Sequence, residues 1–262
     1  MLVARSAGCS PTLFAPIGRR WLSSSVATSS RNASAAGEVA GAGLNVAVFT
    51  GSTREEGPPF PARVGLRVGR WVSAQLEQRG HTVTVVDPVE VSLPMLRKPQ
   101  FAYPSGGAPA NLEELAATIS AADAYVMVSP EYNHSVSPAL ANTLNHFGSS
   151  RFSYKPSGIV TYSQGQWGGT RAAIAMRPLL SELGCLPVSA MVHVPRAQEV
   201  LDQRGQVRGS QEEEEQWAAY FGRMAAQVEW WGAAARSHKA IADPYADAPA
   251  FASKPSQRNA PS

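Results

Sequence analysis

The strongest constraint on the fold is a repeated switch between short apolar runs and longer amphipathic segments after residue 43. Five runs have the length and the β-branched, apolar character of buried strands, at residues 45–49, 82–86, 125–128, 159–162 and 188–194. Segments with helical periodicity separate most of them. A parallel strand can follow another only if the connection crosses a face of the sheet. The pattern therefore predicts an α/β domain, with a five-stranded parallel sheet and helices on both faces.

Local signals place the ends of the predicted helices. Ser137-Pro138 begins one helix, because proline is tolerated in a first turn. Ser210 and Glu213 have the spacing of a capping box before the last helix. Asn111 is predicted to cap a helix that runs to about Ala122. Residues 88–110, rich in proline and glycine, are predicted to be a loop.

The body of the chain is flanked by two segments of different composition. Residues 1–43 are serine-rich and contain four arginines but only one acid, Glu38, which is typical of an organellar transit peptide. We expect import into the mitochondrial matrix. The alternatives are a plastid transit peptide, or a disordered extension without a targeting signal on a cytosolic protein. Residues 44–237 are predicted to form one domain, and residues 238–262, rich in Ala, Pro and Ser, a disordered tail.

Charge and cysteine content narrow the function. Of the 23 basic and 20 acidic residues, four and one lie in residues 1–43, so the remaining chain is formally neutral. A neutral body has no general attraction for nucleic acid or an anionic membrane, and we expect neither as a partner. The two cysteines lack the spacing of a metal site, so no metal is expected. His134, His146 and Cys185 are interpreted as structural residues.

Small and polar residues follow the first predicted strand. Gly51, Ser52, Thr53 and Arg54 can contact an anion through backbone N–H, hydroxyl or guanidinium groups, and Arg63 begins the next helix. We interpret this loop as a phosphate cradle; an ordinary strand-to-helix turn with a solvated arginine is the plain alternative. The loop lacks the GxxxxGK[ST] pattern, and no dinucleotide fingerprint is present. The sequence thus disfavours ATP hydrolysis and a resident dinucleotide.

Two further polar loops follow the third and fourth predicted strands. In a flavodoxin-like strand order of 2-1-3-4-5, these loops meet the first one around a single crevice at the carboxyl ends of the strands. Backbone groups and the Asn133 side chain can hydrogen-bond the edge of a flat heterocycle, with Tyr132 as an apolar wall. Glycines in the later loop allow close backbone approach to such a ring. The predicted contacts are Pro130, Glu131, Tyr132, Asn133, Ser163, Gln164, Gly165, Gln166, Gly168 and Gly169.

These three loops, in this order and spacing, resemble the NADPH-dependent FMN reductase family, which includes quinone and azo reductases with a flavodoxin-like fold. The most specific part is Pro130 to Asn133 followed by Ser137-Pro138-Ala139-Leu140, and the resemblance covers roughly residues 44–195. Two stretches depart from the family pattern. Residues 55–62 lengthen the phosphate loop, and Arg97-Lys98 stands where acids are expected.

The resemblance implies roles for residues and for cofactors. Ser52 and Arg54 would hold the phosphate of FMN, residues 131–133 would line its ring, and residues 163–169 would lie beside it. The implied activity takes hydride from NADPH and passes two electrons to a quinone, free flavin or an azo compound. The flavin carries this chemistry, so we expect no catalytic side chain. The family also implies a homodimer or homotetramer.

A second class of function stays open. A flavin-binding electron carrier or redox-responsive interaction protein with little NADPH turnover would carry the same loops, and a silent structural relative would bind no flavin. The formally neutral body lacks the acidic bias of a small electron carrier, which favours the enzyme.

Overall fold

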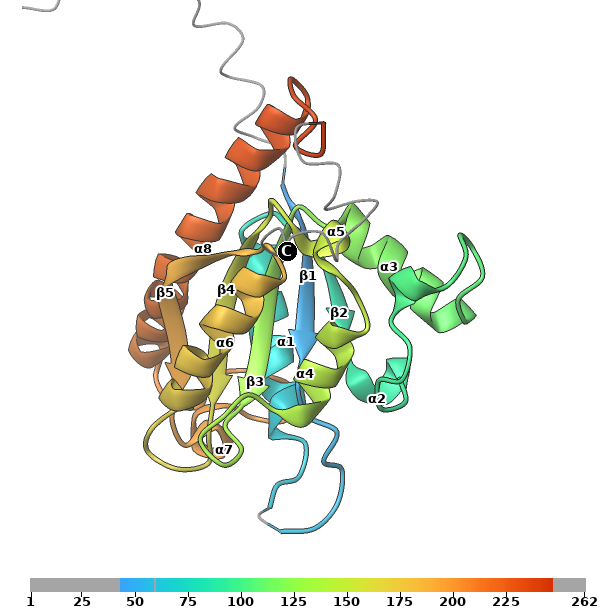
Figure 1. The fold of residues 1–262 in the computed structure, drawn as a ribbon. Helices are drawn as coiled ribbons and strands as arrows, with labels where there is room; N and C mark the ends of the chain where they lie inside the picture. The colour runs from blue at the N-terminus through green and yellow to red at the C-terminus, as the bar shows by residue number, and fades with distance from the viewer. Residues whose placement is uncertain (1–42, 59, 247–262) are drawn as a thin grey trace, which may run out of the picture.

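The computed structural model describes residues 43–246, with the exception of residue 59 (Figure 1). Within that part of the chain, five strands form one parallel sheet in the order β2-β1-β3-β4-β5. The strands are β1 (Asn45–Thr50), β2 (Thr82–Val86), β3 (Ala124–Pro130), β4 (Pro156–Tyr162) and β5 (Leu186–Val194). The predicted parallel sheet and its flavodoxin-like strand order are confirmed.

Helices cover both faces of the sheet (Figure 1). One face packs against α1 (Val64–Gln78) and α8 (Gln211–Lys239). The other packs against α3 (Ala110–Ala121), α4 (Pro138–Asn145) and α6 (Thr170–Glu182). The connections contain the short elements α2 (Pro88–Val91), η1 (Gln100–Ala102), α5 (Ser149–Phe152) and α7 (Ala197–Val200). None of the described helices combines the length and apolar character that crossing a bilayer requires.

The central strands form a rigid platform for the loops at their ends. All seven residues of β3 and of β4 are buried, as expected for strands covered on both faces. The rings of Phe49, Tyr125 and Phe152 pack together beneath the sheet, with centroids 5.2 to 6.1 Å apart. Burying one large apolar side chain stabilises a fold by about 1.5–3 kcal/mol, so this cluster fixes β1 and β3 relative to each other.

Two predicted helix starts are confirmed. The Ser137 hydroxyl accepts a hydrogen bond from the Leu140 N–H at 3.1 Å, with proline in the first turn of α4. Ser210 and Glu213 make both bonds of a capping box at the start of α8. These signals are local, because both partners lie within three residues of each other.

The predicted cap at Asn111 is wrong. Pro109 occupies the cap position of α3, and Asn111 lies inside the first turn. Its side-chain amide donates to the Val91 carbonyl at 3.4 Å instead, while the Glu113 carboxylate accepts from the Ala108 N–H at 3.1 Å. Contacts with the preceding connection therefore decide where this helix begins.

The outer parts of the predicted organisation are only partly described. The stretch 88–110 is not a plain loop, since it contains α2 and η1. The predicted boundary at residue 237 falls inside α8, and Tyr245 packs edge-on against Tyr154 with centroids 5.5 Å apart. The start of the predicted tail thus lies against the domain. The predicted transit peptide, up to residue 42, and the tail from residue 247 lie outside the described residues.

Candidate functional site at the carboxyl edge of the sheet

Three loops meet where β1, β3 and β4 end, at the lower side of Figure 1. The hydroxyls of Ser52 and Tyr132 lie 3.3 Å apart, which joins the first loop to the second. Gln164 donates through its amide to the Pro61 carbonyl at 3.3 Å, which joins the third loop to the first. The strand order places all three loops side by side at the carboxyl edge, the position where ligands bind in open α/β sheets.

The first loop passes close under α4. A Cβ built on Gly51 would lie 2.7 Å from the Ser137 hydroxyl oxygen, so only glycine fits there. Ser52 is buried, and its hydroxyl accepts from the Arg54 N–H at 3.4 Å. Thr53 is exposed. The loop is thereby held with a hydroxyl turned inward.

Helix α1 begins directly beyond this loop without a cap of its own. Arg63 occupies the cap position and makes no side-chain capping bond, and the first turn holds no acidic residue. The N-terminus of an α-helix carries a partial positive charge of about half a unit. The positive end of α1 is therefore not neutralised by an acidic side chain of its own first turn, and it favours an anion bound there.

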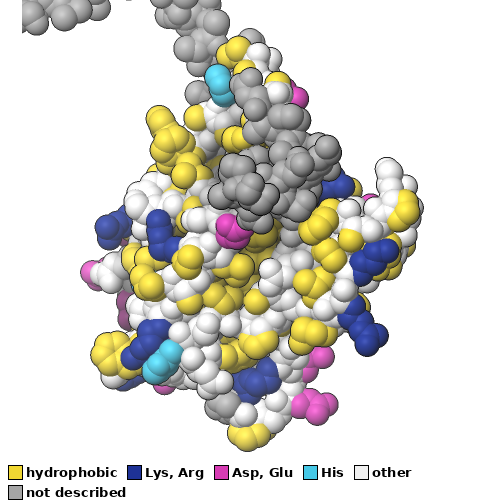
Figure 2. All heavy atoms as spheres, viewed as in Figure 1, with side chains coloured by type: hydrophobic (Ala, Val, Ile, Leu, Met, Phe, Trp, Pro, Cys, Tyr) yellow, Lys and Arg dark blue, Asp and Glu magenta, His cyan; other side chains and the backbone are white. Residues whose placement is uncertain are grey.

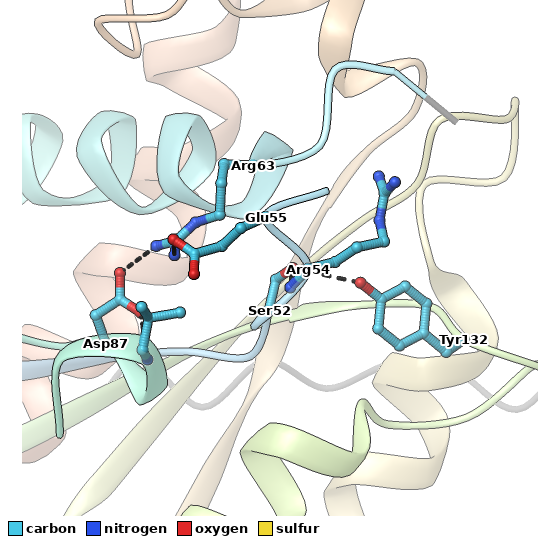
Figure 3. Close-up of polar contacts among 7 residues, drawn as sticks. Ser52, Arg54, Glu55, Arg63, Asp87 and Tyr132 are labelled. Atoms are coloured by element: carbon cyan, nitrogen blue, oxygen red, sulfur yellow. Dashed lines mark hydrogen bonds and ion pairs between the residues drawn. The ribbon is translucent and has the colours of Figure 1, made fainter. Parts of the chain in front are cut away.

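The two arginines expected at a phosphate point to opposite sides of the loop (Figure 3). The Arg54 guanidinium donates to the carbonyls of Gly57 at 3.1 Å and Ala62 at 3.2 Å, within the lengthened stretch of the loop. Arg63 is ion-paired with Asp87 and, at 3.3 Å, with Glu55. Both guanidinium groups are thus engaged by groups of the protein in this structure.

Asp87 is a structural residue beside the first loop. It is 3% exposed at the end of β2. One carboxylate oxygen accepts from the Val89 N–H at 3.0 Å and caps α2, and the other pairs with Arg63. This use of both oxygens explains why Arg63 is drawn toward β2.

The second loop makes a tight turn over the edge of the sheet. Tyr132 and Ser135 exchange backbone hydrogen bonds of 3.3 and 3.0 Å, and Asn133 and His134 between them have φ of 50° and 61°. Two consecutive positive φ values are typical of a type I′ turn. Asn133 and His134 are therefore displayed at an exposed tip.

Glu131 is turned away from this tip. Its carboxylate accepts from the backbone N–H groups of Arg171 at 3.0 Å and Ala172 at 3.3 Å, and from the Arg171 guanidinium at 3.0 Å. Burial raises the pKa of this carboxyl, but these hydrogen bonds outweigh burial and hold the pKa below its usual value. The cap residue of α6 is Gly169, which has no side chain to offer, so Glu131 supplies the missing cap from the neighbouring loop.

The third loop needs its glycine pair for the fold itself. Gly168 and Gly169 have φ of 62° and 83°, and added Cβ atoms would lie 3.0 Å from His193 Cβ and 2.8 Å from Thr161 Cβ. These two glycines are therefore required for packing against β4 and β5, not for contact with a ligand. By contrast, Gly165 has open space around it, and Gly165 and Gln166 are exposed. The exposed part of this loop is therefore its earlier half.

Ser163 and Trp167 complete this loop in different ways. The Ser163 hydroxyl donates to the Gly165 carbonyl and accepts from the Gly168 N–H, both at 2.9 Å. Trp167 is 59% exposed, with the Arg171 guanidinium 5.7 Å from its ring centroid. Ser163 is a loop brace, whereas Trp167 offers an apolar surface at the edge.

Tyr162 is the group that the sequence interpretation missed. It ends β4, is 4% exposed, and its hydroxyl has no hydrogen-bond partner among the described residues. A Cβ built on Gly65 would lie 2.3 Å from this hydroxyl, and 3.1 Å from Ser52 Cβ. The unpartnered hydroxyl therefore lies between the first loop and the first turn of α1. Its sequence neighbours give no signal of this, because Gly65 is almost a hundred residues away.

Two of the hollows on the described surface lie beside opposite ends of the strands. One of about 260 Å³ adjoins the first loop, between Thr53, Met95 and α4. A second, of about 470 Å³, lies at the opposite edge of the sheet, beside the end of α8. Lys and Arg side chains are scattered among apolar and acidic ones over the face in Figure 2. No group of three or more potential metal ligands gathers among the described residues.

Known proteins resemble both the sequence and the fold. An NAD(P)H-dependent FMN reductase of Pseudomonas aeruginosa is 29% identical over 150 residues, which cover 54% of this chain and 80% of that protein. A quinone reductase of Escherichia coli is 40% identical over 77 residues, 28% of this chain. That match spans only 41% of the quinone reductase.

Solved structures agree on the fold. The flavoenzyme NAD(P)H:(acceptor) oxidoreductase FerB of Paracoccus denitrificans superposes with a TM-score of 0.56 at 18% identity, covering 71% of this chain and 97% of that one. An NADH:FMN oxidoreductase gives 0.52 at 15% identity, covering 70% and 89%. The model of the NADPH-dependent FMN reductases matches residues 44–199, more than half of the chain. The chain therefore belongs to the NADPH-dependent FMN reductase family, whose members are NAD(P)H-dependent flavoprotein oxidoreductases.

Proposed function

We propose that this protein transfers two electrons from NADPH to a quinone or a similar small acceptor, through FMN held at the carboxyl edge of the sheet. Family membership supports FMN and NAD(P)H. A small oxidised acceptor is supported by the quinone reductase and NADPH azoreductase relatives. The observation that carries the proposal is the meeting of three loops beside an uncapped helix N-terminus.

The phosphate end of the proposed site suits a doubly charged group. The uncapped start of α1, the Ser52 hydroxyl and the unpartnered Tyr162 hydroxyl lie together. A helix N-terminus with hydroxyl donors beside it favours phosphate. Arg54 and Arg63 would first have to leave their present partners. We therefore assign phosphate binding to the backbone and hydroxyl groups, with the arginines as a source of longer-range attraction.

The ring end of the proposed site lies between the second and third loops. The turn around Asn133 presents backbone groups and an amide, and residues 164–166 form the opposite rim. Such groups can hydrogen-bond the polar edge of a flat heterocycle and leave one face open to a second molecule. The Glu131 side chain would contribute by holding α6 in place, not by touching the ring.

FMN held here would supply the redox chemistry, namely acceptance of hydride from NADPH and return of two electrons and a proton to the acceptor, whose second proton would come from solvent. The protein orients the reactants and keeps the exposed face accessible to each in turn. Backbone N–H groups of the two rim loops favour negative charge on an adjacent ring. No side-chain acid or base is required by this scheme.

The proposal is tested with purified protein and FMN under anaerobic conditions. Addition of NADPH should bleach the flavin absorbance, and a naphthoquinone added afterwards should restore it. Flavin that stays oxidised in excess NADPH would contradict the reductase and favour an electron carrier. Flavin that is reduced but not reoxidised by the quinone would contradict the proposed acceptor class.

Assembly and address are separate proposals. The family resemblance supports a homodimer or homotetramer, which light scattering on the purified protein would detect as two or four chain masses; a single chain mass would contradict it.

The composition of residues 1–43 supports mitochondrial import. A fluorescent reporter fused behind these residues should enter mitochondria, and a reporter that stays in the cytosol would contradict the address.

A further inference from the structure

The Tyr162 hydroxyl lies beside Ser52 but makes no hydrogen bond of good geometry among the described residues. The hydroxyl is buried and has no partner among the described residues. Leaving a buried hydroxyl unpaired destabilises the folded state. Burial raises the pKa of this tyrosine well above its usual value, so the group keeps its proton and remains a donor.

The position of this hydroxyl is set by α1. Gly65, the second residue of the helix, is needed because a Cβ there would lie 2.3 Å from the Tyr162 oxygen. The same Cβ would lie 3.1 Å from Ser52 Cβ. The Tyr162 hydroxyl therefore stands at the N-terminus of a 15-residue helix and beside the first loop.

The charged groups around this point leave its positive potential unopposed. Asp87 and Glu55 are paired with Arg63, and Glu131 is paired with Arg171. Each of these carboxylates thus faces a cation, with Asp87 and Glu55 sharing Arg63. The donors that remain converge on one place, as they do where an anion binds.

Other unpartnered hydroxyls do not share this setting. Ser149, Ser153 and Ser157 are also buried without partners among the described residues. They lie at the amino edge of the sheet, in or next to the four-residue α5 and at the start of β4. None adjoins the first turn of a long helix. Tyr162 differs from these serines because its unpartnered hydroxyl lies beside the first turn of α1.

We propose that Tyr162 is a phosphate-binding residue, whose hydroxyl donates a hydrogen bond to the phosphate of FMN. This inference rests on the proposed function. The hydroxyl is covered in this structure, so binding requires the first loop to open around it. The contact that gives way is the 3.3 Å one between Ser52 and Tyr132, which spans the two loops (Figure 3).

The test compares two tyrosine variants, Tyr162→Phe and Tyr125→Phe. Tyr125 is a matched control, because it is equally buried on the adjacent strand but its hydroxyl donates to the Ile119 carbonyl at 2.8 Å. FMN and riboflavin, which lacks the phosphate, are titrated by flavin fluorescence, and unfolding in urea is measured without flavin. Tyr162→Phe should weaken FMN binding about tenfold or more, as expected for a hydrogen bond to a charged group. Riboflavin binding should be unchanged, and stability equal or higher.

The control should behave in the opposite way. Tyr125→Phe should lower stability and leave FMN binding unchanged. Equal FMN affinity of Tyr162→Phe and wild type would overturn the inference, as would an equal loss for FMN and riboflavin, which would place the hydroxyl at the ring. A loss of stability as large as that of the control would show that the hydroxyl is bonded within the protein. Wild type that binds no FMN at all would overturn the proposed function itself.

Discussion

Tyr125 and Tyr162 lie on neighbouring strands, both almost fully buried, yet their surroundings differ. At the amino edge, the Tyr125 hydroxyl and the Lys155 ammonium both donate to the carbonyl of Ile119, at the end of α3. At the carboxyl edge, the Tyr162 hydroxyl has no described partner and α1 has no cap. The polar groups of the first region close a helix, and we propose that those of the second bind a ligand.

The comparison also shows why cavity size is a poor guide here. The hollow of about 470 Å³ lies at the amino edge, lined largely by apolar groups of α8 and by Lys155. Burial lowers the pKa of Lys155 to about 8, and its ammonium group donates to two carbonyls at the end of α3. Its donors serve the fold, so the larger hollow lacks the converging donors found at the carboxyl edge.

The largest effect should come from breaking the amino edge. In Gly184→Ala, a side chain would be forced on a residue with φ of 81°, and its Cβ would lie 2.1 Å from the Ser153 hydroxyl oxygen. The left-handed conformation and the overlap together should lower the free energy of unfolding by about 2–5 kcal/mol. Urea unfolding measures this loss. FMN affinity of the folded fraction should not change; a loss of binding in step with stability would mean that the two edges are not independent.

A substitution at the carboxyl edge should instead affect binding. Gly65→Ala places a Cβ 2.3 Å from the buried Tyr162 oxygen, an overlap that should outweigh the roughly 1 kcal/mol by which alanine favours the helix, so stability should fall by about 1–2 kcal/mol, less than in Gly184→Ala, where the left-handed conformation adds its own cost. FMN binding should weaken about tenfold or more, because the added methyl displaces the donors around the phosphate. Fluorescence titration gives the dissociation constant.

Gly222→Ala is the matched control for this substitution. It also replaces a helical glycine, on α8, where a Cβ would meet only the Arg79 side chain at 3.6 Å. We expect a gain in stability of about 1 kcal/mol and unchanged FMN binding. Equal FMN affinities for the two alanine variants would show that Gly65 does not adjoin the phosphate-binding site.

Glu131→Gln should have the smallest effect and sharpens the boundary of the site. The variant weakens the cap of α6, so we expect a loss of about 1 kcal/mol near neutral pH and unchanged FMN affinity. The folded state lowers the pKa of this carboxyl, so its contribution is complete above the ordinary pKa. It disappears as pH falls through the lowered pKa, because the unfolded chain binds the proton first.

The wild-type advantage over Glu131→Gln should therefore shrink on acidification, in urea titrations repeated from neutral to acidic pH. A constant difference would contradict the assigned cap. A clear loss of FMN affinity in the variant would return Glu131 to the ring contacts that the family resemblance implied.

Sequence alone was sufficient for the sheet order and for caps made within three residues, such as Ser137 with Leu140. It was insufficient where distant contacts compete with a local signal. Asn111 is a good capping residue, but its amide is taken by Val91, across the preceding connection. Local propensity cannot report such a partner.

The same limit applies within the site. The residues of the three loops were predicted, but not the directions of their side chains. Glu131 turns toward α6 because Gly169 cannot cap that helix, and Arg63 turns toward Asp87 at the end of β2. From the sequence, Tyr162 was predicted only to end a strand. The residues around its hydroxyl, Ser52 after β1 and Gly65 on α1, are distant in the sequence.

The most direct test of the central claim is a crystal structure of the complex with FMN. We expect the phosphate at the start of α1, within hydrogen-bond distance of the Ser52 and Tyr162 hydroxyls, and the ring between residues 131–133 and 164–166. Density for the flavin in the amino-edge hollow beside α8, or a phosphate remote from Tyr162, would contradict it.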